Sequence, residues 1–286
     1  MIALALTLLI GALPELVIDE SKAPLKVFVV PNGYDLRYKK FVSAHGFPIL
    51  ATEKVSDFAL LEAGFLINKM LDPRPGIRKA MVKNRCRLVI MAHNEWTTDV
   101  AEHSDLEPKD YWNRRARGLG PTPQRPAVSC GEENLLCFPG DPYAAENILI
   151  HEFAHAMHLM GLNTADRKFD QQLRECYEVA MGEGLWKGKY AATNKEEYWA
   201  ECVQSWFDTN RPPDHDHNHV RTRADLKKYD PRVAELVKEI FGDEEWRYQR
   251  PQERKAADRA HLAGYEPKTA PRFEWPPRLK DALKKK

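Results

Sequence analysis

Apolar residues recur at helical spacing in several stretches of the chain, each bounded by residues that cap or break helices. In the stretch SDFALLEAGFLINKML, Ser56 is a candidate N-cap and apolar residues follow every three to four positions. Two other stretches begin near a proline, Pro75 and Pro231, at the position where helices favour that residue. The pattern predicts helices over residues 56–71, 75–83, 166–181 and 194–207, and one that begins at Asp230 and Pro231.

Short continuous apolar runs predict strands in the first half of the chain. KVFVV at residues 26–30 is closed by Pro31, and RLVIM at residues 87–91 is the clearest strand. We expect 87–91 to be either an ordinary buried strand or the sheet edge along which an extended substrate lies. From 93 to 140, glycine and proline predict mostly irregular structure.

The apolar stretch NILIHEFAHAMHLMG, residues 147–161, contains His151, Glu152 and His155 in the order HExxH. Residues four apart lie on the same face of an α-helix, so the two imidazoles can bind one metal ion. Glu152 can reach a water in the open position of that metal without being a ligand itself. The spacing therefore predicts a zinc site.

The bounds of this helix are predicted from its flanks. Asp141 followed by Pro142 has the pattern of an N-cap and a first helical residue, and Gly161 is expected to end the helix. The alternative is a chance match, because the chain has ten histidines. An apolar helix with defined ends favours the metal site.

A catalytic zinc usually has three protein ligands and a water, so a further ligand is needed. The predicted helix 194–207 offers Glu197 and Glu201, four apart on one face. Thr193 and Glu196 match a capping box, which would use Glu196 at the helix start. One of the two remaining carboxylates can bind the metal while the other accepts a hydrogen bond from a ligand histidine. Two solvated glutamates are the alternative.

His158 is a less suitable ligand than the downstream carboxylates. Ligands at 151, 155 and 158 would crowd one helix. We expect His158 to have a structural role or to support the ligands from behind.

HEFAH followed by KYAATNKEEYWAE resembles the catalytic domain of anthrax toxin lethal factor and its zinc metallopeptidase relatives, over about residues 145–207. The resemblance implies a gluzincin-type peptidase with Glu197 as third zinc ligand and Glu201 behind a ligand. It also implies Tyr190 as the hydroxyl that helps hold the oxyanion. The targets and the delivery of the toxin do not carry over, because the chain lacks the toxin's further domains.

These residues together predict a zinc metallopeptidase acting on a peptide or protein. Zinc held by His151, His155 and Glu197 would lower the pKa of a bound water toward about 7. Glu152 would be the general base, and Tyr190 would stabilise the oxyanion unless it is a core aromatic. Two alternatives remain, a zinc-stabilised binding protein without catalysis and a zinc amidase or esterase acting on a non-protein substrate.

Composition adds expectations about location and partners. The formal net charge of +1 over 286 residues gives no argument for nucleic acid. The leader MIALALTLLIGA is too short to span a membrane and is typical of a signal peptide, although it lacks a basic n-region. We therefore expect a secreted or periplasmic protein without stable membrane insertion.

The five cysteines are compatible with export. Cys130 with Cys137 could close a small loop, and Cys176 with Cys202 could cross-link two helices. Buried free thiols are the alternative.

The fold class that the sequence predicts is α+β, a zincin-like domain with helices around the metal and a small mixed sheet. We expect a signal peptide over residues 1–23, the catalytic domain over 24–248, and a basic, proline-containing, weakly ordered tail over 249–286. The stretch DHDHNH, residues 214–219, is expected to be a polar, solvated turn rather than a second metal site or a segment that folds over the cleft.

Overall fold

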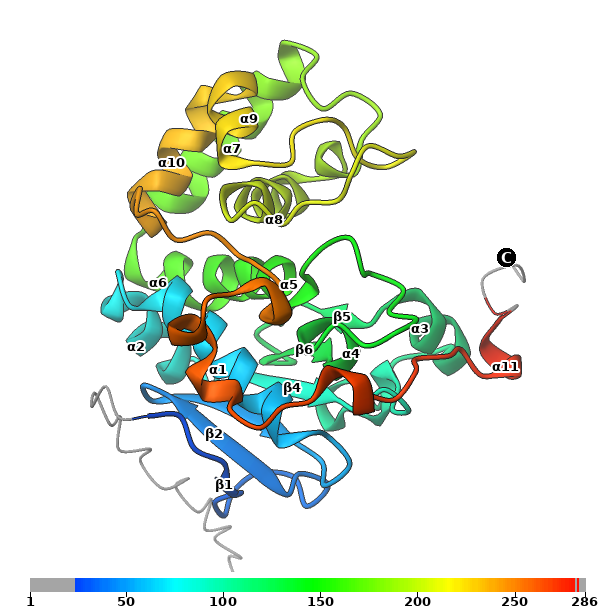
Figure 1. Ribbon diagram of the computed structural model, residues 1–286. Helices are drawn as coiled ribbons and strands as arrows, with labels where there is room; N and C mark the ends of the chain where they lie inside the picture. The colour runs from blue at the N-terminus through cyan, green and yellow to red at the C-terminus, as the bar shows by residue number, and fades with distance from the viewer. Residues whose placement is uncertain (1–23, 281, 283–286) are drawn as a thin grey trace, which may run out of the picture.

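A computed structural model describes residues 24–280 and residue 282; the expected signal peptide lies outside them. A mixed sheet occupies one end of the molecule, and a group of helices occupies the other (Figure 1). The strands are β1 (Phe28–Val29), β2 (Lys40–Ala44), β3 (Phe47–Ala51), β4 (Arg87–Met91), β5 (Gly118–Leu119) and β6 (Ala127–Gly131). The chain has an α+β fold, as predicted.

The strands follow the order β1-β2-β3-β4-β6-β5 across the sheet. β1, β2 and β3 are antiparallel, β3, β4 and β6 are parallel, and β5 runs antiparallel to β6. β4 is therefore paired on both sides. It is an ordinary buried strand, and the hypothesis that residues 87–91 line a sheet edge is wrong.

The stretch from 93 to 140, expected to be mostly irregular, also contains the unpredicted strands β5 and β6 and two short helices. All five residues of β6, AVSCG, are buried. A strand buried on both faces shows no polar alternation, and alanine, serine and glycine have low strand propensity. Pairing with β4 and β5 establishes this strand, and that pairing is not visible in the local sequence.

The helices agree with the predicted ones to within a few residues in five cases: α1, α2, α7, α8 and α10. The α-helices of the described part of the chain are α1 (Asp57–Leu71), α2 (Pro75–Lys83), α3 (Lys109–Arg115), α4 (Glu132–Leu135), α5 (Ile148–Ala156), α6 (Asn163–Ala165), α7 (Phe169–Gly182), α8 (Lys195–Trp206), α9 (Arg223–Tyr229), α10 (Pro231–Phe241) and α11 (Pro277–Lys280). Within the described residues, no helix is both long enough and apolar enough to cross a membrane.

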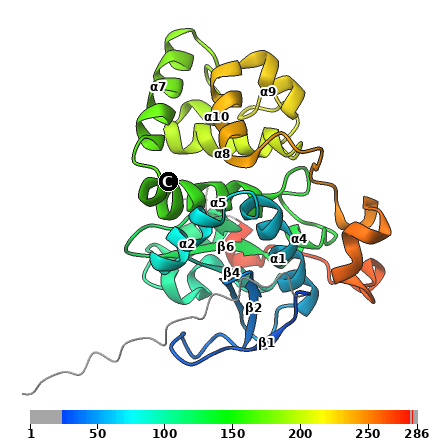
Figure 2. The same cartoon turned by 90° about the vertical axis from the view of Figure 1, so that its left-hand side faces the viewer.

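In the ribbon, α5 and α8 lie between the sheet and the remaining helices of the other end (Figures 1 and 2). A hydrophobic core that includes residues of both helices joins the two ends. The ring of Phe47 on β3 meets that of Phe153 on α5, with centroids 5.2 Å apart. At the far side of α8, Trp199 meets Phe169 of α7 at 5.0 Å. Burial on both sides holds α5 and α8 firmly against each other, and this pair of helices carries the candidate site.

The predicted start of the HExxH helix is wrong. α5 begins after Asn147, whose Oδ1 accepts a hydrogen bond from the amide of Ile150 at 2.9 Å. Asp141 instead organises the loop before it, accepting hydrogen bonds from the amide of Tyr143 and from Nδ2 of Asn134. The side-chain cap that the sequence placed at Asp141 is thus supplied by an asparagine nearer the motif.

The predicted end of this helix at Gly161 is wrong as well. The helical backbone continues through a π-helical turn, Met157–Leu162, into α6. A Cβ at Gly161 would lie 2.6 Å from Cγ2 of Ile77 on α2. The glycine is therefore explained by close packing between two helices and not by a helix end.

The described part of the tail, residues 249–280, packs against the body, contrary to the expectation of weak order. Glu62 on α1 is fully buried, and Arg254 donates to its two carboxylate oxygens at 2.9 and 2.5 Å. His261 lies 2.8 Å from the same carboxylate, and Phe273 is also buried. A buried carboxylate requires such partners, and charge-rich composition alone does not reveal where they are.

All five cysteines are free thiols, so both proposed disulfides are wrong. Cys86, Cys130 and Cys202 are buried, and burial raises the pKa of each thiol. These three cysteines serve as small apolar residues of the core.

Candidate metal centre

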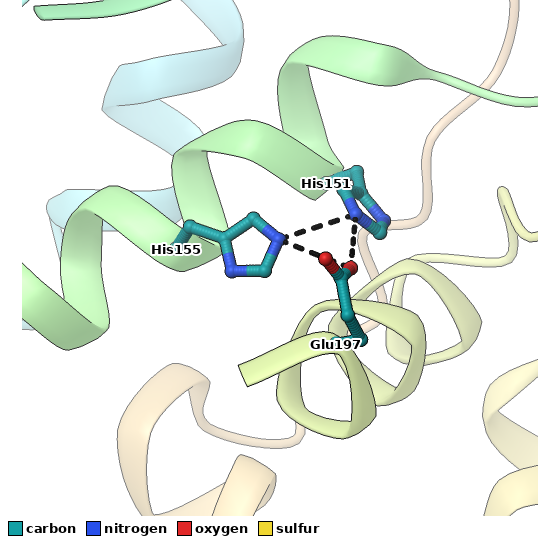
Figure 3. Close-up of side chains that lie close together, drawn as sticks. All are labelled: His151, His155 and Glu197. Atoms are coloured by element: carbon teal, nitrogen blue, oxygen red, sulfur yellow. Dashed lines mark hydrogen bonds and ion pairs between the residues drawn. The ribbon is translucent and has the colours of Figure 1, made fainter. Parts of the chain in front are cut away.

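The candidate centre lies where the second turn of α5 faces the first turn of α8 (Figure 3). His151 and His155 project from α5 toward Glu197 on α8. The indole of Trp199 donates to the carbonyl oxygen of Ala154 at 3.0 Å, which ties the two helices together directly beside the site. The spacing of the histidines and the packing of α8 thus bring the three side chains together.

The start of α8 differs from the expected capping box of Thr193 and Glu196. Asn194 is the N-cap, and its Oδ1 accepts a hydrogen bond from the amide of Glu197 at 2.8 Å. The cap holds the backbone of Glu197 at the first turn, where its side chain faces α5.

Three potential ligand atoms form a nearly equilateral triangle. Nε2 of His151 lies 3.3 Å from Nε2 of His155 and 3.2 Å from Oε2 of Glu197, and the remaining edge is 3.4 Å. A tetrahedral zinc with bonds of about 2.0–2.1 Å has neighbouring ligands about 3.3–3.4 Å apart. The residues therefore fit three corners of a zinc tetrahedron. In the described part of the chain, no other group of three such side chains converges in this way.

The charges around the triangle also favour a cation. Burial lowers the pKa of His151, but Glu197, Glu152 and Glu201 outweigh it and raise the pKa to about 10. Burial raises the pKa of Glu197, yet hydrogen bonds to His151 and His155 hold it well below its usual range. Carboxylates thus dominate the electrostatics of the site, and a divalent cation would offset them.

The residue behind His151 is one that the sequence analysis missed. Oε1 of Gln204 lies 2.8 Å from Nδ1 of His151, whereas Glu201 lies at 3.5 Å. A hydrogen bond from Nδ1 to the amide oxygen leaves the lone pair of Nε2 facing the triangle. Gln204 follows Glu201 by three residues and Glu197 by seven, so the helical spacing could have revealed it.

Glu201 has other contacts. Its Oε2 accepts a hydrogen bond from Nδ2 of Asn210 at 3.1 Å and lies 3.7 Å from Nε2 of His217. Glu201 is buried and contributes charge to the site from behind His151.

Glu152 and Tyr190 line one cavity of about 280 Å³ beside His151. Burial raises the pKa of Glu152, which makes the carboxylate a stronger base. Burial and the charge of Glu197 raise the pKa of Tyr190, so the phenol keeps its proton and remains a donor. The backbone amide of Tyr190 donates to the carbonyl oxygen of Asp216 at 2.7 Å, which fixes the turn that carries the ring.

The stretch 214–219 is largely solvated, as the sequence predicts, since four of its six residues are exposed, but one of its histidines is not. His217 is buried and lines the cavity with Asp216, while His215 is exposed. Asp214 accepts hydrogen bonds from both the amide and Nδ1 of His217, each at 2.8 Å. Asp216 and His217 thus form part of the cavity wall, and the hydrogen bonds to Asp214 hold His217 in place.

His158 points away from the triangle. It is fully buried, and its Nε2 lies 2.9 Å from Oδ1 of Asp170 on α7. Its contact links α7 to the π-helical turn, in keeping with the structural role expected of it.

The edge strand β5 passes close to α5. A Cβ at Gly118 would lie 2.5 Å from Cγ2 of Ile148 and 2.8 Å from Cγ of Glu152. Only a residue without a side chain permits this approach, which places a sheet edge next to the candidate base.

Comparisons with known proteins do not assign this chain to a family. No family model matches the chain, and no curated protein matches it. Among solved structures, the PRO-PRO endopeptidase PPEP-2 from Paenibacillus alvei is similar with a TM-score of 0.43 and 18% identity, over 68% of this chain and 97% of that one. A likeness this distant assigns neither a fold family nor a reaction. The resemblance of residues 145–207 to the lethal factor domain stays a prediction.

Proposed function

We propose that this protein is a zinc-dependent metallopeptidase of the gluzincin type, with a zincin-like catalytic domain. The observation that carries the proposal is the triangle of His151, His155 and Glu197, whose edges match a zinc site. Glu152 and Tyr190 line the adjoining cavity with the chemistry that peptide hydrolysis requires. The substrate would be a peptide or protein.

A zinc ion held by these three residues would supply Lewis-acid chemistry, lowering the pKa of a coordinated water and polarising a carbonyl oxygen. Glu152 would accept a proton from the attacking water as its oxygen bonds to the carbonyl carbon. The same carboxyl would then give that proton to the amide nitrogen as the carbon–nitrogen bond breaks. Burial of Glu152 supports this exchange, because a raised pKa allows the group both to accept and to release the proton.

Tyr190 would donate a hydrogen bond to the carbonyl oxygen as negative charge develops there. Its phenol lies beside Glu197 and its ring centroid is 6.3 Å from that of His151, so it is on the metal side of the cavity. A donor placed in advance stabilises the oxyanion without reorganisation during the reaction.

The function is tested by Glu152→Gln, with Glu178→Gln on the exposed face of α7 as a matched control. We expect both variants and the wild type to bind zinc equally. Cleavage of a diverse peptide library should fall by about 10²-fold or more in Glu152→Gln alone and should require zinc. Wild-type cleavage by zinc-loaded Glu152→Gln would contradict the mechanism.

The same assays distinguish the alternatives. A zinc amidase or esterase would leave peptides intact and hydrolyse small amides or esters with the same dependence on Glu152. A zinc-stabilised binding protein would hydrolyse none of these substrates. Export to the periplasm or the medium is part of the proposal and is checked by fractionating cells that express the whole chain.

A further inference from the structure

The cavity beside the candidate centre has three arginines in its wall, Arg115, Arg117 and Arg211. Arg117 is fully buried and pairs with the buried Glu133 at 2.5 Å. Arg211 donates from Nε to Oε1 of Glu146 at 2.9 Å. The charges of Arg117 and Arg211 are therefore offset within the protein.

Arg115 is different. Within the described residues, no carboxylate forms an ion pair with it. Its neighbours are the phenols of Tyr190 and Tyr111; burial lowers the pKa of Arg115, but these phenols outweigh it and raise the pKa. The side chain remains exposed at the cavity rim. A guanidinium with phenols as neighbours keeps its full charge and can still receive an anion.

The acidic groups of the cavity wall are already occupied. Glu146 pairs with Arg211, Glu201 with Asn210, and Asp216 with His215. Glu152 would face the positive charge of the proposed metal. The charge of Arg115 acts on the carboxylate of Glu152 through space, but among the described residues Arg115 forms no ion pair with any of these acids.

The backbone that carries Arg115 is held on several sides. Its carbonyl oxygen accepts a hydrogen bond from the hydroxyl of Tyr143, and the next carbonyl, that of Ala116, accepts one from Thr97. The preceding Arg114 stacks over Trp275 of the tail, 4.5 Å from the ring centroid. The end of α3 is therefore a rigid support, so that binding a ligand at Arg115 requires no ordering of the backbone that carries it.

The position of Arg115 relative to the reacting atoms favours a group of the substrate as its ligand. Tyr190 would touch the scissile carbonyl, and Arg115 lies beside Tyr190. A group that meets the guanidinium thus belongs to the substrate, close to the bond that is cut. Carboxylates match a guanidinium geometrically through two parallel hydrogen bonds.

We propose that Arg115 binds a carboxylate of the substrate next to the scissile peptide bond, so that the enzyme prefers acidic substrates. This inference rests on the proposed function. The carboxylate is either an aspartate or glutamate side chain or the free C-terminus of the peptide. In the second case, the enzyme removes short C-terminal fragments.

The test uses alanine-rich hexapeptides with glutamate or glutamine at each position in turn, each with a free or an amidated C-terminus. Wild type, Arg115→Gln and Arg115→Glu are compared, with Lys109→Gln at the exposed start of α3 as a charge-matched control. Steady-state kinetics give kcat and KM separately. Binding of the same peptides to each variant combined with Glu152→Gln gives affinity without turnover.

We expect wild type and Lys109→Gln to prefer one carboxylate-bearing set of peptides over its neutral counterpart. That set is either the peptides with glutamate, compared with those with glutamine, or the peptides with a free C-terminus, compared with the amidated ones. Arg115→Gln should lose about 10- to 100-fold in kcat/KM on that set, mainly through KM, and little on the neutral set. Arg115→Glu should lower kcat/KM on the carboxylate-bearing set further than Arg115→Gln does. Preference for an internal glutamate indicates a side-chain carboxylate, and preference for the free C-terminus indicates the terminal one.

Two results would overturn the inference. One is that wild type binds the charged and the neutral peptides with equal affinity and cuts them with equal kcat/KM. The other is an equal loss on both sets in Arg115→Gln, which would mean that Arg115 only positions Tyr190. If wild type cuts no peptide, the proposed peptidase function fails, while the binding measurements still decide whether Arg115 recognises a carboxylate.

Discussion

The amide oxygen of Gln204 lies 2.8 Å from Nδ1 of His151, closer than the carboxylate of Glu201 at 3.5 Å. Nε2 of Gln204 in turn donates to Glu146 at 3.1 Å, which fixes the orientation of the amide. The ring of His151 is therefore held by a neutral acceptor, with Nε2 directed at Glu197 and His155. The affinity of the site for zinc should therefore depend on Gln204.

Gln204→Leu should weaken zinc binding by about 10- to 100-fold, because the ring of His151 would lose its orienting partner. Competition with a chromogenic chelator measures this affinity. Gln172→Leu on the exposed surface of α7 is the matched control and should bind zinc as wild type does. A larger effect of Glu201→Gln than of Gln204→Leu would reverse the assignment.

Glu197→Ala should reduce zinc from about one ion per chain to a small fraction, because two histidines alone hold the ion weakly. Elemental analysis of purified protein gives the ratio, and Glu196→Gln on the same turn is the control. Full occupancy in Glu197→Ala would remove Glu197 from the ligand set. Zinc-free wild type would make HEFAH a chance match.

Tyr190→Phe should lower kcat by about 10²- to 10³-fold with little change in KM, since the hydroxyl acts on charge that develops in the transition state. Steady-state kinetics on a peptide that wild type cuts provide the measurement. An unchanged kcat would leave Tyr190 as an aromatic wall of the cavity.

Arg254→Met should destabilise the protein by about 3–5 kcal/mol, because Glu62 would remain buried without its main partner. Urea unfolding gives the free energy, and Arg259→Met on the exposed surface of the tail is the control. A loss below about 1 kcal/mol would show that the tail contributes little to the stability of the body.

Asp170 gives a stability change that depends on pH. Burial raises its pKa, but hydrogen bonds from Lys195 and His158 outweigh burial and lower the pKa to about 2. The stabilisation of the fold by Asp170 is therefore complete above about pH 4, the pKa of the carboxyl in the unfolded chain. It is lost as the pH falls toward about 2.

Asp170→Asn should accordingly lower the unfolding free energy by about 1 kcal/mol at pH 7, a value reduced for the partial exposure of the carboxylate. The difference from wild type should shrink below about pH 4. Urea midpoints at pH 7 and pH 3 measure it. A difference that grows on acidification would contradict the assigned partners.

The N-terminal half shows where sequence patterns were insufficient. α1 and β4 were predicted from local periodicity and apolar runs, because each has a clear pattern between defined ends. β3 and β6 were not predicted. Both are buried along their whole length, and their place in the sheet depends on partners that are distant in sequence.

The sequence by itself determined the spacing of His151, Glu152 and His155 on one helix, and of Glu197, Glu201 and Gln204 on another. Helical periodicity alone places His151 with His155 on one face of the first helix, with Glu152 one position further round. It likewise places Glu197, Glu201 and Gln204 on one face of the second, so no tertiary information was needed. Only the tertiary structure decided that these faces meet, and that Gln204 rather than Glu201 lies against His151. It alone brought Arg115 beside Tyr190, because packing between distant segments, and not local pattern, sets such contacts.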